Sequence, residues 1–446
     1  MLYRLLYPLN VGFWLICFGI VIAAFSWPQS GHTQLLIEIN EGVTNPVPVA
    51  IVPFSSQKAE GLPGNLSEII TNDLMISGQF RLLHQKNMPD TDMIYSGRIG
   101  YEDWSRIRAD YVLAGSIENT DGTSYKVRFE LFDIVNRSSV VRKQMIFTKN
   151  TYRDTAHRIS DLVYEQITGV RGVFSTKLAY VTVSGKNPKK RQHRLEISDS
   201  DGARAKVILK SFEPIMSPSW SPDSKKIAYV SFELGRSNVY VQNLETGERE
   251  LFSGFRGING SPAWSPDGQY LAVVLSRGAN PDIHLINLST KKVERLTRHP
   301  AIDTEPSWSS DSKNILFTSD RKDGVHIYEA DVATKTIKRM TTTGKYNARA
   351  RYTLQDTSFV MVSQDPDTKD YNIVSQNLVT GAKKLLSTSS LDESPSVSPN
   401  GSHIIFSTKR DGKSILVVVS VDLGIKYYLP YSRGEVRDPA WSPFVY

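Results

Sequence analysis

The chain has 446 residues and a formal net charge of +7, a mild basic excess for this length. With 40% hydrophobic and 22% charged residues, its composition is that of a folded globular protein and excludes a largely disordered chain. No nucleic-acid-binding motif accompanies the basic excess, so we expect a mildly basic surface and no nucleic-acid partner.

Residues 1–26 are predicted to be an export signal. Arg4 precedes an apolar run over residues 11–25, which is shorter than the about 20 residues that a bilayer span needs. The small residues Ala24 and Ser26 fit a cleavage site, and the alternative is an uncleaved membrane anchor. The only cysteine, Cys17, lies in this run, so the exported chain would contain no disulfide.

Residues 27–34 are predicted to be a polar linker, and residues 35–169 a small α+β domain. Alternating or continuous apolar residues predict its strands, which are 35–40, 46–54, 111–117, 125–133 and 140–148. Helices are expected over 66–74 and 101–108. A last helix should be capped by Thr151 and Asp154 and should end at Gly169.

Residues 171–446 carry a repeat of the form Pro-x-Trp-Ser-Pro-Asp-Gly. Its aromatic position recurs at spacings of 44, 44, 44, 45 and 44 residues. The positions are Trp220, Trp264, Trp308, Tyr352, Val397 and Trp441. A period in the low forties is typical of a four-stranded propeller blade. Asp223, Asp267 and Asp311 follow Ser-Pro or Ser-Ser in this repeat, so we interpret them as turn formers and not as a carboxylate site.

The two ends of this region complete each other. Residues 176–183 match the second strand of a blade but have no first strand before them, and residues 441–443 match a first strand with no blade after it. We therefore predict a six-bladed all-β propeller whose last blade is closed by the C-terminal strand, because closure removes exposed sheet edges.

The sequence contains no nucleophile elbow, no His-Glu-x-x-His zinc motif and no phosphate-binding loop. Its 8 histidines are scattered singly. We expect no catalytic residue, no metal site and no cofactor. Two enzyme classes stay open as alternatives. A peptidase-like hydrolase would need an additional hydrolase domain, and a glycan lyase would need histidines or carboxylates that converge in the channel.

The order of these parts resembles TolB, a family of periplasmic propeller proteins of the Tol–Pal system. The stretches that carry the resemblance are residues 49–54, 304–308, 317–320, 391–395 and 439–443, whereas Ser310, Tyr352 and Val397 depart from the repeat. The resemblance implies a monomeric, non-enzymatic periplasmic protein. It would bind the lipoprotein Pal through the propeller and TolA through the N-terminal segment, with room for other envelope partners. It would support outer-membrane integrity and constriction at cell division.

The predicted Pal-binding surface is the set of residues just before each inner strand, which should ring one mouth of the channel. They mix apolar, amide and charged side chains, as protein interfaces do; the alternative is that they are ordinary loop residues. The set is Ile215, Met216, Ile258, Asn259, Ser261, Asp303, Thr304, Glu305, Asn347, Arg349, Asp392, Glu393, Val436 and Arg437.

The predicted TolA contact is the N-terminal segment, represented by Trp27, Leu35, Ile37 and Ile39. The last three alternate along the chain, so the segment could add an edge strand to a partner's sheet. The alternative is an ordinary first strand of the α+β domain. A segment that is docked in one state and released in another would couple the two partners.

Overall fold

The computed structural model describes residues 36–39, 45–95, 98–187, 190–278, 280–353, 356–429 and 434–445, with only the backbone described at 36–39, 57 and 58. Leu36–Tyr446 forms one compact unit. Among the helices of these residues, none is long and apolar enough to span a bilayer. The predicted export signal and the residues Trp27 and Leu35 lie outside the described residues.

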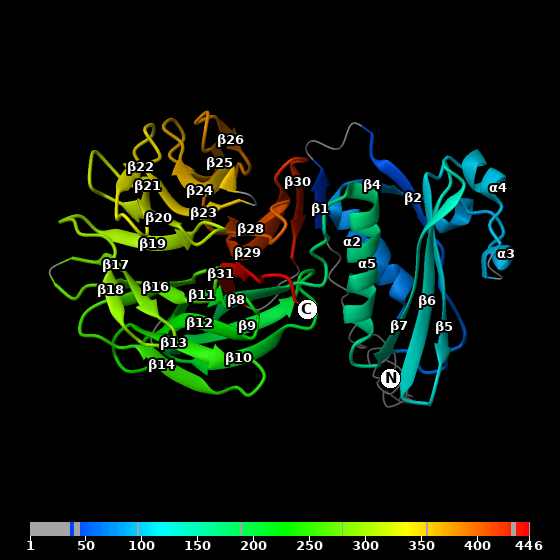
Figure 1. Ribbon diagram of the computed structural model, residues 1–446, viewed down its shortest axis with the longest axis horizontal. Coiled ribbons are helices and arrows are strands. Elements are labelled where there is room, and N and C mark those ends of the chain that lie inside the picture. Colours follow the sequence, from blue (N-terminus) through cyan, green and yellow to red (C-terminus); the bar gives the residue numbers. More distant parts are fainter. Residues whose placement is uncertain are drawn as a thin grey trace, which may run out of the picture. The chain divides into compact units, whose positions relative to one another are not determined.

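The N-terminal α+β region is built on one mixed sheet with the order β4-β2-β5-β6-β7, and β3 pairs with β5 beside it. β2 runs parallel to β4 and β5, whereas β5, β6 and β7 are antiparallel. Helices α2 and α5 pack against each other beside this sheet (Figure 1). The strands are β2 (Val47–Ile51), β3 (Ser55–Lys58), β4 (Phe80–Leu82), β5 (Tyr111–Asn119), β6 (Ser124–Asp133) and β7 (Ser138–Thr148). The helices are α2 (Leu66–Ser77), the 3-10 turn η1 (Gln85–Asn87), α3 (Asp92–Tyr95), α4 (Tyr101–Arg106) and α5 (Tyr152–Thr168).

The two ends of α5 differ in how well the sequence predicted them. Gly169 ends the helix in a left-handed conformation with φ 74°, as predicted. Thr151 is the N-cap residue as predicted, but its hydroxyl makes no capping bond and instead accepts a hydrogen bond from the Thr148 N–H at 3.0 Å. The Asp154 carboxylate instead pairs with Arg204 at 2.6 Å. Arg204, which is distant in the sequence, therefore binds Asp154, the side chain that the local pattern assigned to the helix cap.

Six four-stranded antiparallel sheets form the propeller, and one of them carries an additional strand, β1. Successive blades comprise β11 (Ile215–Trp220) to β14 (Arg249–Ser253), β15 (Asn259–Trp264) to β18 (Val293–Arg295), β19 (Asp303–Trp308) to β22 (Ile337–Arg339), β23 (Asn347–Tyr352) to β26 (Lys383–Leu385), and β27 (Asp392–Val397) to β30 (Ile425–Tyr428). The closing blade joins β31 (Glu435–Trp441) to β8 (Lys177–Ser184), β9 (Gln192–Asp199) and β10 (Lys206–Ser211).

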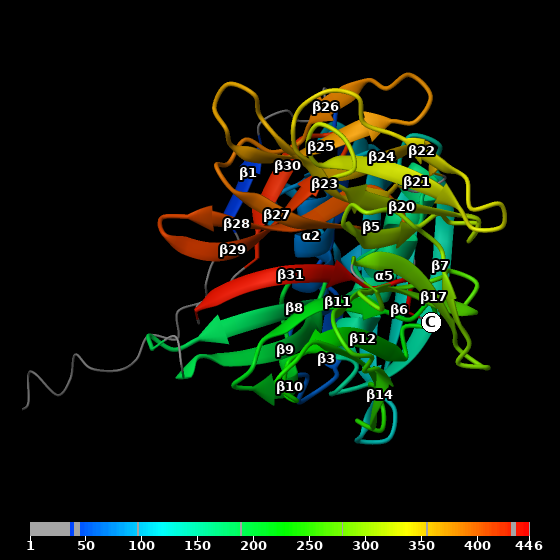
Figure 2. The same ribbon diagram turned by 90° about the vertical axis from the view of Figure 1, so that its left-hand side faces the viewer.

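The C-terminal strand closes the ring as predicted. β31 pairs antiparallel with β8, with Val436 opposite Thr182 and Trp441 opposite Leu178. Figure 2 shows the two strands side by side although they come from opposite ends of the propeller sequence. The prediction of six blades sealed by this strand is confirmed.

The repeated tryptophan connects three of the blades to the preceding one, through Trp220, Trp264 and Trp308. The Trp264 indole N–H donates to the Ser219 carbonyl at 3.1 Å, and that of Trp308 donates to the Ala263 carbonyl at 3.0 Å. A buried indole needs such an acceptor. The repeat therefore specifies contacts between blades as well as strands within them.

The repeated aspartates are turn formers, as interpreted from the sequence. The Ser265 hydroxyl donates to Asp267 at 2.6 Å, and the Gln269 N–H donates to the same oxygen at 2.9 Å. Asp223 and Asp311 make the equivalent pairs of bonds in their own turns. These carboxylates are occupied by local hydrogen bonds.

Strand β1 (Leu36–Ile39) belongs to the propeller and not to the α+β sheet. It pairs antiparallel with β30, with Ile37 opposite Tyr427 and Ile39 opposite Ile425, and it lies beside β30 in Figure 1. The prediction that residues 35–40 form a first strand of the α+β domain is therefore wrong. The segment forms the fifth strand of the sheet β1-β30-β29-β28-β27.

Ion pairs centred on Asp199 connect α5 to the closing blade. The Asp199 carboxylate lies 2.8 Å from Lys177, 2.8 Å from Arg204 and 3.2 Å from Arg153. It also lies 3.7 Å from Nε2 of His157. Burial alone would raise the pKa of Asp199, but the nearby His157, the hydrogen bonds from Arg204 and the charge of Lys177 hold it far below its usual range. This carboxylate stays ionised and fixes the junction.

Candidate functional site

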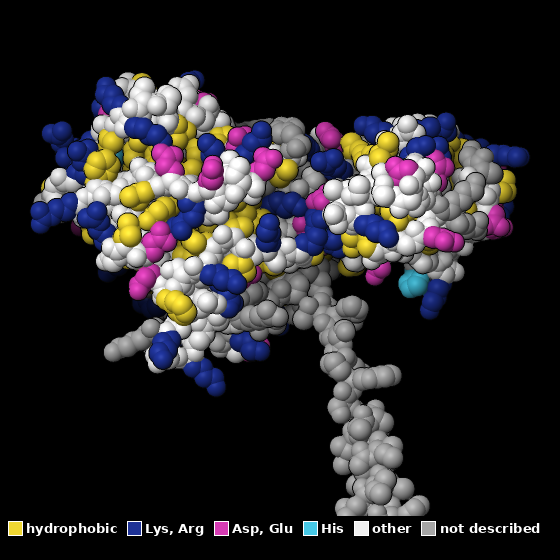
Figure 3. All heavy atoms as spheres, turned by 90° about the horizontal axis from the view of Figure 1, so that it is seen from below, with side chains coloured by type: hydrophobic (Ala, Val, Ile, Leu, Met, Phe, Trp, Pro, Cys, Tyr) yellow, Lys and Arg dark blue, Asp and Glu magenta, His cyan; other side chains and the backbone are white. Residues whose placement is uncertain are grey.

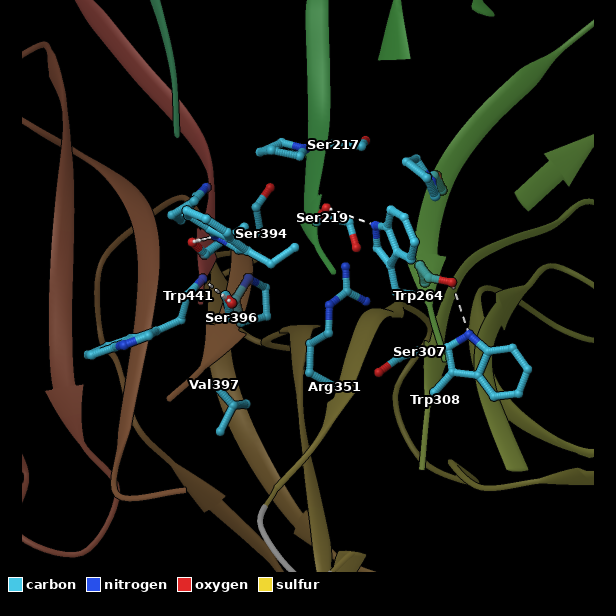
Figure 4. A pocket seen from close by; sticks show the side chains of 18 of the residues that line it. Ser217, Ser219, Trp264, Ser307, Trp308, Arg351, Ser394, Ser396, Val397 and Trp441 are labelled. Carbon is cyan, nitrogen blue, oxygen red and sulfur yellow. Dashed lines mark hydrogen bonds between the residues drawn. The ribbon is translucent and has the colours of Figure 1, made fainter. Parts of the chain in front are cut away.

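The six inner strands β11, β15, β19, β23, β27 and β31 converge on a cavity of about 640 Å³ along the propeller channel. Figure 4 shows side chains of these strands around this space, with that of Arg351 directed into it. Serines, prolines and tryptophans provide most of the lining, together with Arg349, Arg351, Glu305 and Asp438. The lining therefore mixes polar and apolar groups, with charges that come from only three of the six strands.

Each inner strand contains one residue in the left-handed backbone region, at the point where its pairing with the next strand shifts register. The residues are Ser217, Ser261, Glu305, Arg349, Ser394 and Asp438, with φ between 43° and 57°. In five strands proline follows this residue, and proline cannot donate to the sheet. Such conformations cost about 1–3 kcal/mol each. We call these six residues the channel ring, since they line the cavity together.

Arg349 organises the charges of the channel ring. Its Nε lies 2.9 Å from Glu305, and its Nη1 lies 3.5 Å from Asp438. The Ser394 hydroxyl also donates to Asp438, at 2.9 Å. Burial alone would lower the pKa of Arg349, but Glu305 and Asp438 raise it. Both carboxylates are thus bonded to one arginine, which makes them poor candidates for proton transfer.

Among the described residues that line the cavity there is no histidine. The one group of described side chains that could hold a metal ion is Asp73, His157 and Asp201, which lies away from the channel. There, Nδ1 of His157 is 2.8 Å from Asp73. Burial alone would lower the pKa of His157, but Asp73 and Asp199 raise it to about 10. In this structure the group is an ion-paired cluster, in which His157 contacts Asp73 and Arg153 contacts Asp201.

Six of the residues predicted to bind Pal are buried, contrary to the expectation that all would stand on the rim. They are Ile215, Asn259, Asp303, Asn347, Asp392 and Val436, each with 0% of its surface exposed. Asn259 accepts from the Phe255 N–H at 3.0 Å and donates to the Phe255 carbonyl at 2.7 Å. Asp303 pairs with Arg321 at 2.6 Å. These side chains support the rim loops and cannot touch a partner directly.

The other eight predicted residues fall into two groups. Ser261, Glu305 and Arg349 belong to the channel ring, inside the cavity. The remaining five are accessible at the rim or half-buried there: Ile258, Glu393, Met216, Thr304 and Arg437. Ile258 is 46% exposed, which is unusual for a large apolar side chain beside a fully buried neighbour.

One residue earlier in each repeat lies a mostly apolar position, of which only Ile258 was predicted from the sequence. Ile302, the counterpart of Ile258, is 49% exposed. We call the six residues at this position the rim residues: Pro214, Ile258, Ile302, Tyr346, Leu391 and Glu435. Five of the six carry apolar or aromatic side chains, and all are exposed or half-buried. The same 44-residue period, moved by one position, would have found them.

The residues predicted to bind TolA are only partly described. Ile37 and Ile39 lie in β1, where their backbone pairs with β30. No described carboxylate or histidine cluster accompanies this segment. On the face seen in Figure 3, lysines and arginines are interspersed with acidic side chains and do not gather into one basic surface.

Comparisons with known proteins agree with this architecture. Residues 35–140 match the model of the TolB amino-terminal domain, and residues 164–445 match that of the TolB beta propeller domain. The Tol-Pal system protein TolB of Pseudomonas aeruginosa is 49% identical over 407 residues, which cover 91% of this chain and 94% of that protein. Its counterpart in Hydrogenovibrio crunogenus is 48% identical over 432 residues, covering 96% and 99%.

A solved structure shows the same likeness in three dimensions. The crystal structure of TolB from Acinetobacter baumannii aligns with a TM-score of 0.84 at 36% identity, covering 92% of this chain and 100% of that one. Both domains match in the expected order, and the likeness extends over nearly the whole length. The chain therefore belongs to the TolB family.

Proposed function

We propose that this chain is a non-enzymatic periplasmic scaffold of the Tol–Pal system. Pal docks on the rim residues at the channel mouth, and TolA binds the N-terminal segment. Through these contacts the protein supports outer-membrane integrity and constriction at division. The observation that carries the proposal is the ring of mostly apolar rim residues, of which Ile258 and Ile302 are exposed, in a chain similar over its length to proteins named for that system.

The rim has the features of a specific protein-binding surface. Exposed apolar side chains that gather in one place on a folded protein mark interaction sites. Ile258 and Ile302 stand on neighbouring blades, and Glu393 and Arg437 add charges of both signs at the same level. An apolar centre with a polar surround excludes water from the contact, and this is where binding energy concentrates.

The channel itself favours binding over catalysis. Glu305 and Asp438 are both held by Arg349, and apart from Arg351 the rest of the described lining consists of uncharged side chains, mainly serines, prolines and tryptophans. The repeated left-handed residues are held in place by six equivalent strands. Such a ring suits recognition, because residues that are already ordered lose little conformational entropy when a partner binds.

The rim is tested by placing charge on it. Ile258→Glu combined with Thr304→Arg should lower the affinity for Pal at least about tenfold, since both would place an unpaired charge in the contact. Val379→Glu is the matched control, because Val379 is 91% exposed on an outer hairpin. Calorimetric titration with Pal gives the affinities, and the unfolding midpoint checks the fold. Equal affinities in the wild type and the rim variant would remove this mouth as the site.

The N-terminal proposal rests on β1. In this structure β1 occupies the edge of β30, and a strand that pairs at an edge can pair at another edge as well. Deleting residues 27–38 should abolish capture of TolA while Pal still binds, because the rim lies on other strands. Pull-down of TolA from the deletion variant at wild-type yield would contradict the proposal.

A further inference from the structure

A second ring of side chains lies two residues beyond the channel ring on each inner strand. It consists of Ser219, Ala263, Ser307, Arg351, Ser396 and Ala440. Five blades therefore build this level with a serine or an alanine, and only β23 carries a charged residue. The five other strands share the same register shift, so the inner strand does not need an arginine to fold.

Arg351 has no acidic partner. Its Nη1 donates to the carbonyl of the adjacent Ala350 at 2.9 Å, and no described carboxylate lies within 4.0 Å of it. Glu305 and Asp438 are both bonded to Arg349 instead. Burial lowers the pKa of Arg351, with only distant carboxylates to oppose it. A guanidinium removed from bulk water without a paired anion is costly.

Two hydroxyls face the same space. In Figure 4 the Arg351 side chain points into the cavity toward Ser219, with Ser307 beside it. Among the described residues neither hydroxyl donates a hydrogen bond to a protein group. A guanidinium fork fits carboxylate and phosphate oxygens in a bidentate manner, and a serine hydroxyl can donate one further bond.

We propose that Arg351, with the hydroxyls of Ser219 and Ser307, forms an oxyanion-binding site inside the propeller channel that takes a carboxylate or a phosphate group. The oxyanion comes either from a free anion or from an acidic side chain of the docked partner. The second source rests on the proposed function, and the first does not.

The free-anion source is tested on the full chain with inorganic phosphate, at constant ionic strength so that general screening does not change. Phosphate should raise the melting temperature of the wild type saturably, by about 1–2 °C at tenfold excess over its dissociation constant. Arg351→Ser installs the residue that three other blades have at this level, and it should lose this shift. Arg158→Ser removes the same charge from the exposed face of α5 and should keep it.

The partner source is tested by titrating Pal into the same three proteins with and without phosphate. If the oxyanion is a partner side chain, Arg351→Ser weakens Pal binding roughly tenfold and phosphate competes with Pal. If it is a free anion, Arg351→Ser leaves Pal affinity unchanged while the melting-temperature shift caused by phosphate is lost.

An identical phosphate-induced shift in wild type and Arg351→Ser contradicts the proposed site. So does the absence of any phosphate shift together with unchanged Pal affinity. Failure of Pal to bind any of the three proteins contradicts the proposed function and leaves the phosphate result to decide the site.

Discussion

His157 is a buried ionisable group at the junction between α5 and the closing blade, with 1% of its surface exposed. Three carboxylates surround it: Asp73 at 2.8 Å from Nδ1, Asp199 at 3.7 Å from Nε2, and Asp201 close by. Arg153 bonds two of these from the next turn of the helix. The imidazolium therefore has anionic partners on both sides, and this keeps it charged in spite of burial.

Stability should depend on the charge of His157. Its pKa is about 10 in the folded chain and about 6.5 when unfolded, so its contribution is complete below about pH 6.5 and is lost as pH rises toward 10. We expect His157→Gln to lose about 3 kcal/mol at pH 6.5, because it removes the cation that faces the buried Asp73 carboxylate. The difference from wild type should shrink by pH 10. Urea unfolding of both proteins at each pH measures this, and a difference that does not change with pH would contradict the charged state.

Single residues were predictable where their role is local. The turn aspartates could be assigned from the sequence because Asp267 bonds groups within two residues of itself. Asp154 was assigned wrongly, because Arg204 lies 50 residues away and its charge outweighs a cap. The predicted binding residues Asn259 and Asp303 turned out buried for the same kind of reason: loops of neighbouring strands close over them.

Among the elements, the blades could be predicted from the sequence. For β1 the strand could be predicted, but the strand with which it pairs could not. Each blade is made of hairpins between neighbouring strands, so the period of the sequence fixes its pairing. The alternation of Ile37 and Ile39 indicated a strand, but it could not identify a partner. That partner is β30 (Ile425–Tyr428), at the other end of the chain. Alternation gives the face of a strand, whereas the edge that receives it is decided by the fold.

The inner strands of the channel were likewise predictable as strands but not in their backbone detail. The repeat predicted six inner strands, and they line one cavity. It could not predict that one residue in each would take a left-handed conformation, since none of the six is glycine. Most non-glycine residues avoid this region. The pairing of each inner strand with its blade imposes it, and this sets which side chains reach the channel.

For the whole molecule, closure of the ring couples all six blades. β31 covers the edge of β8, the Trp220 indole donates to the Ala440 carbonyl at 3.0 Å, and the Trp441 indole donates to the Thr176 hydroxyl at 2.8 Å. Deleting residues 437–446 removes all of these at once. It also exposes the β8 edge and the apolar face of the neighbouring blade around Trp220.

We therefore expect this deletion to destabilise the whole propeller and not a single blade. The urea midpoint should fall markedly or the transition should lose its cooperativity, because every blade depends on neighbours on both sides. A chain that lacks only residues 445 and 446 is the control, since β31 ends at Trp441. Circular dichroism and tryptophan fluorescence measure the transitions. Cooperative unfolding at an unchanged midpoint in the longer deletion would mean that the ring does not need its seal, and that the blades are stable as an open stack.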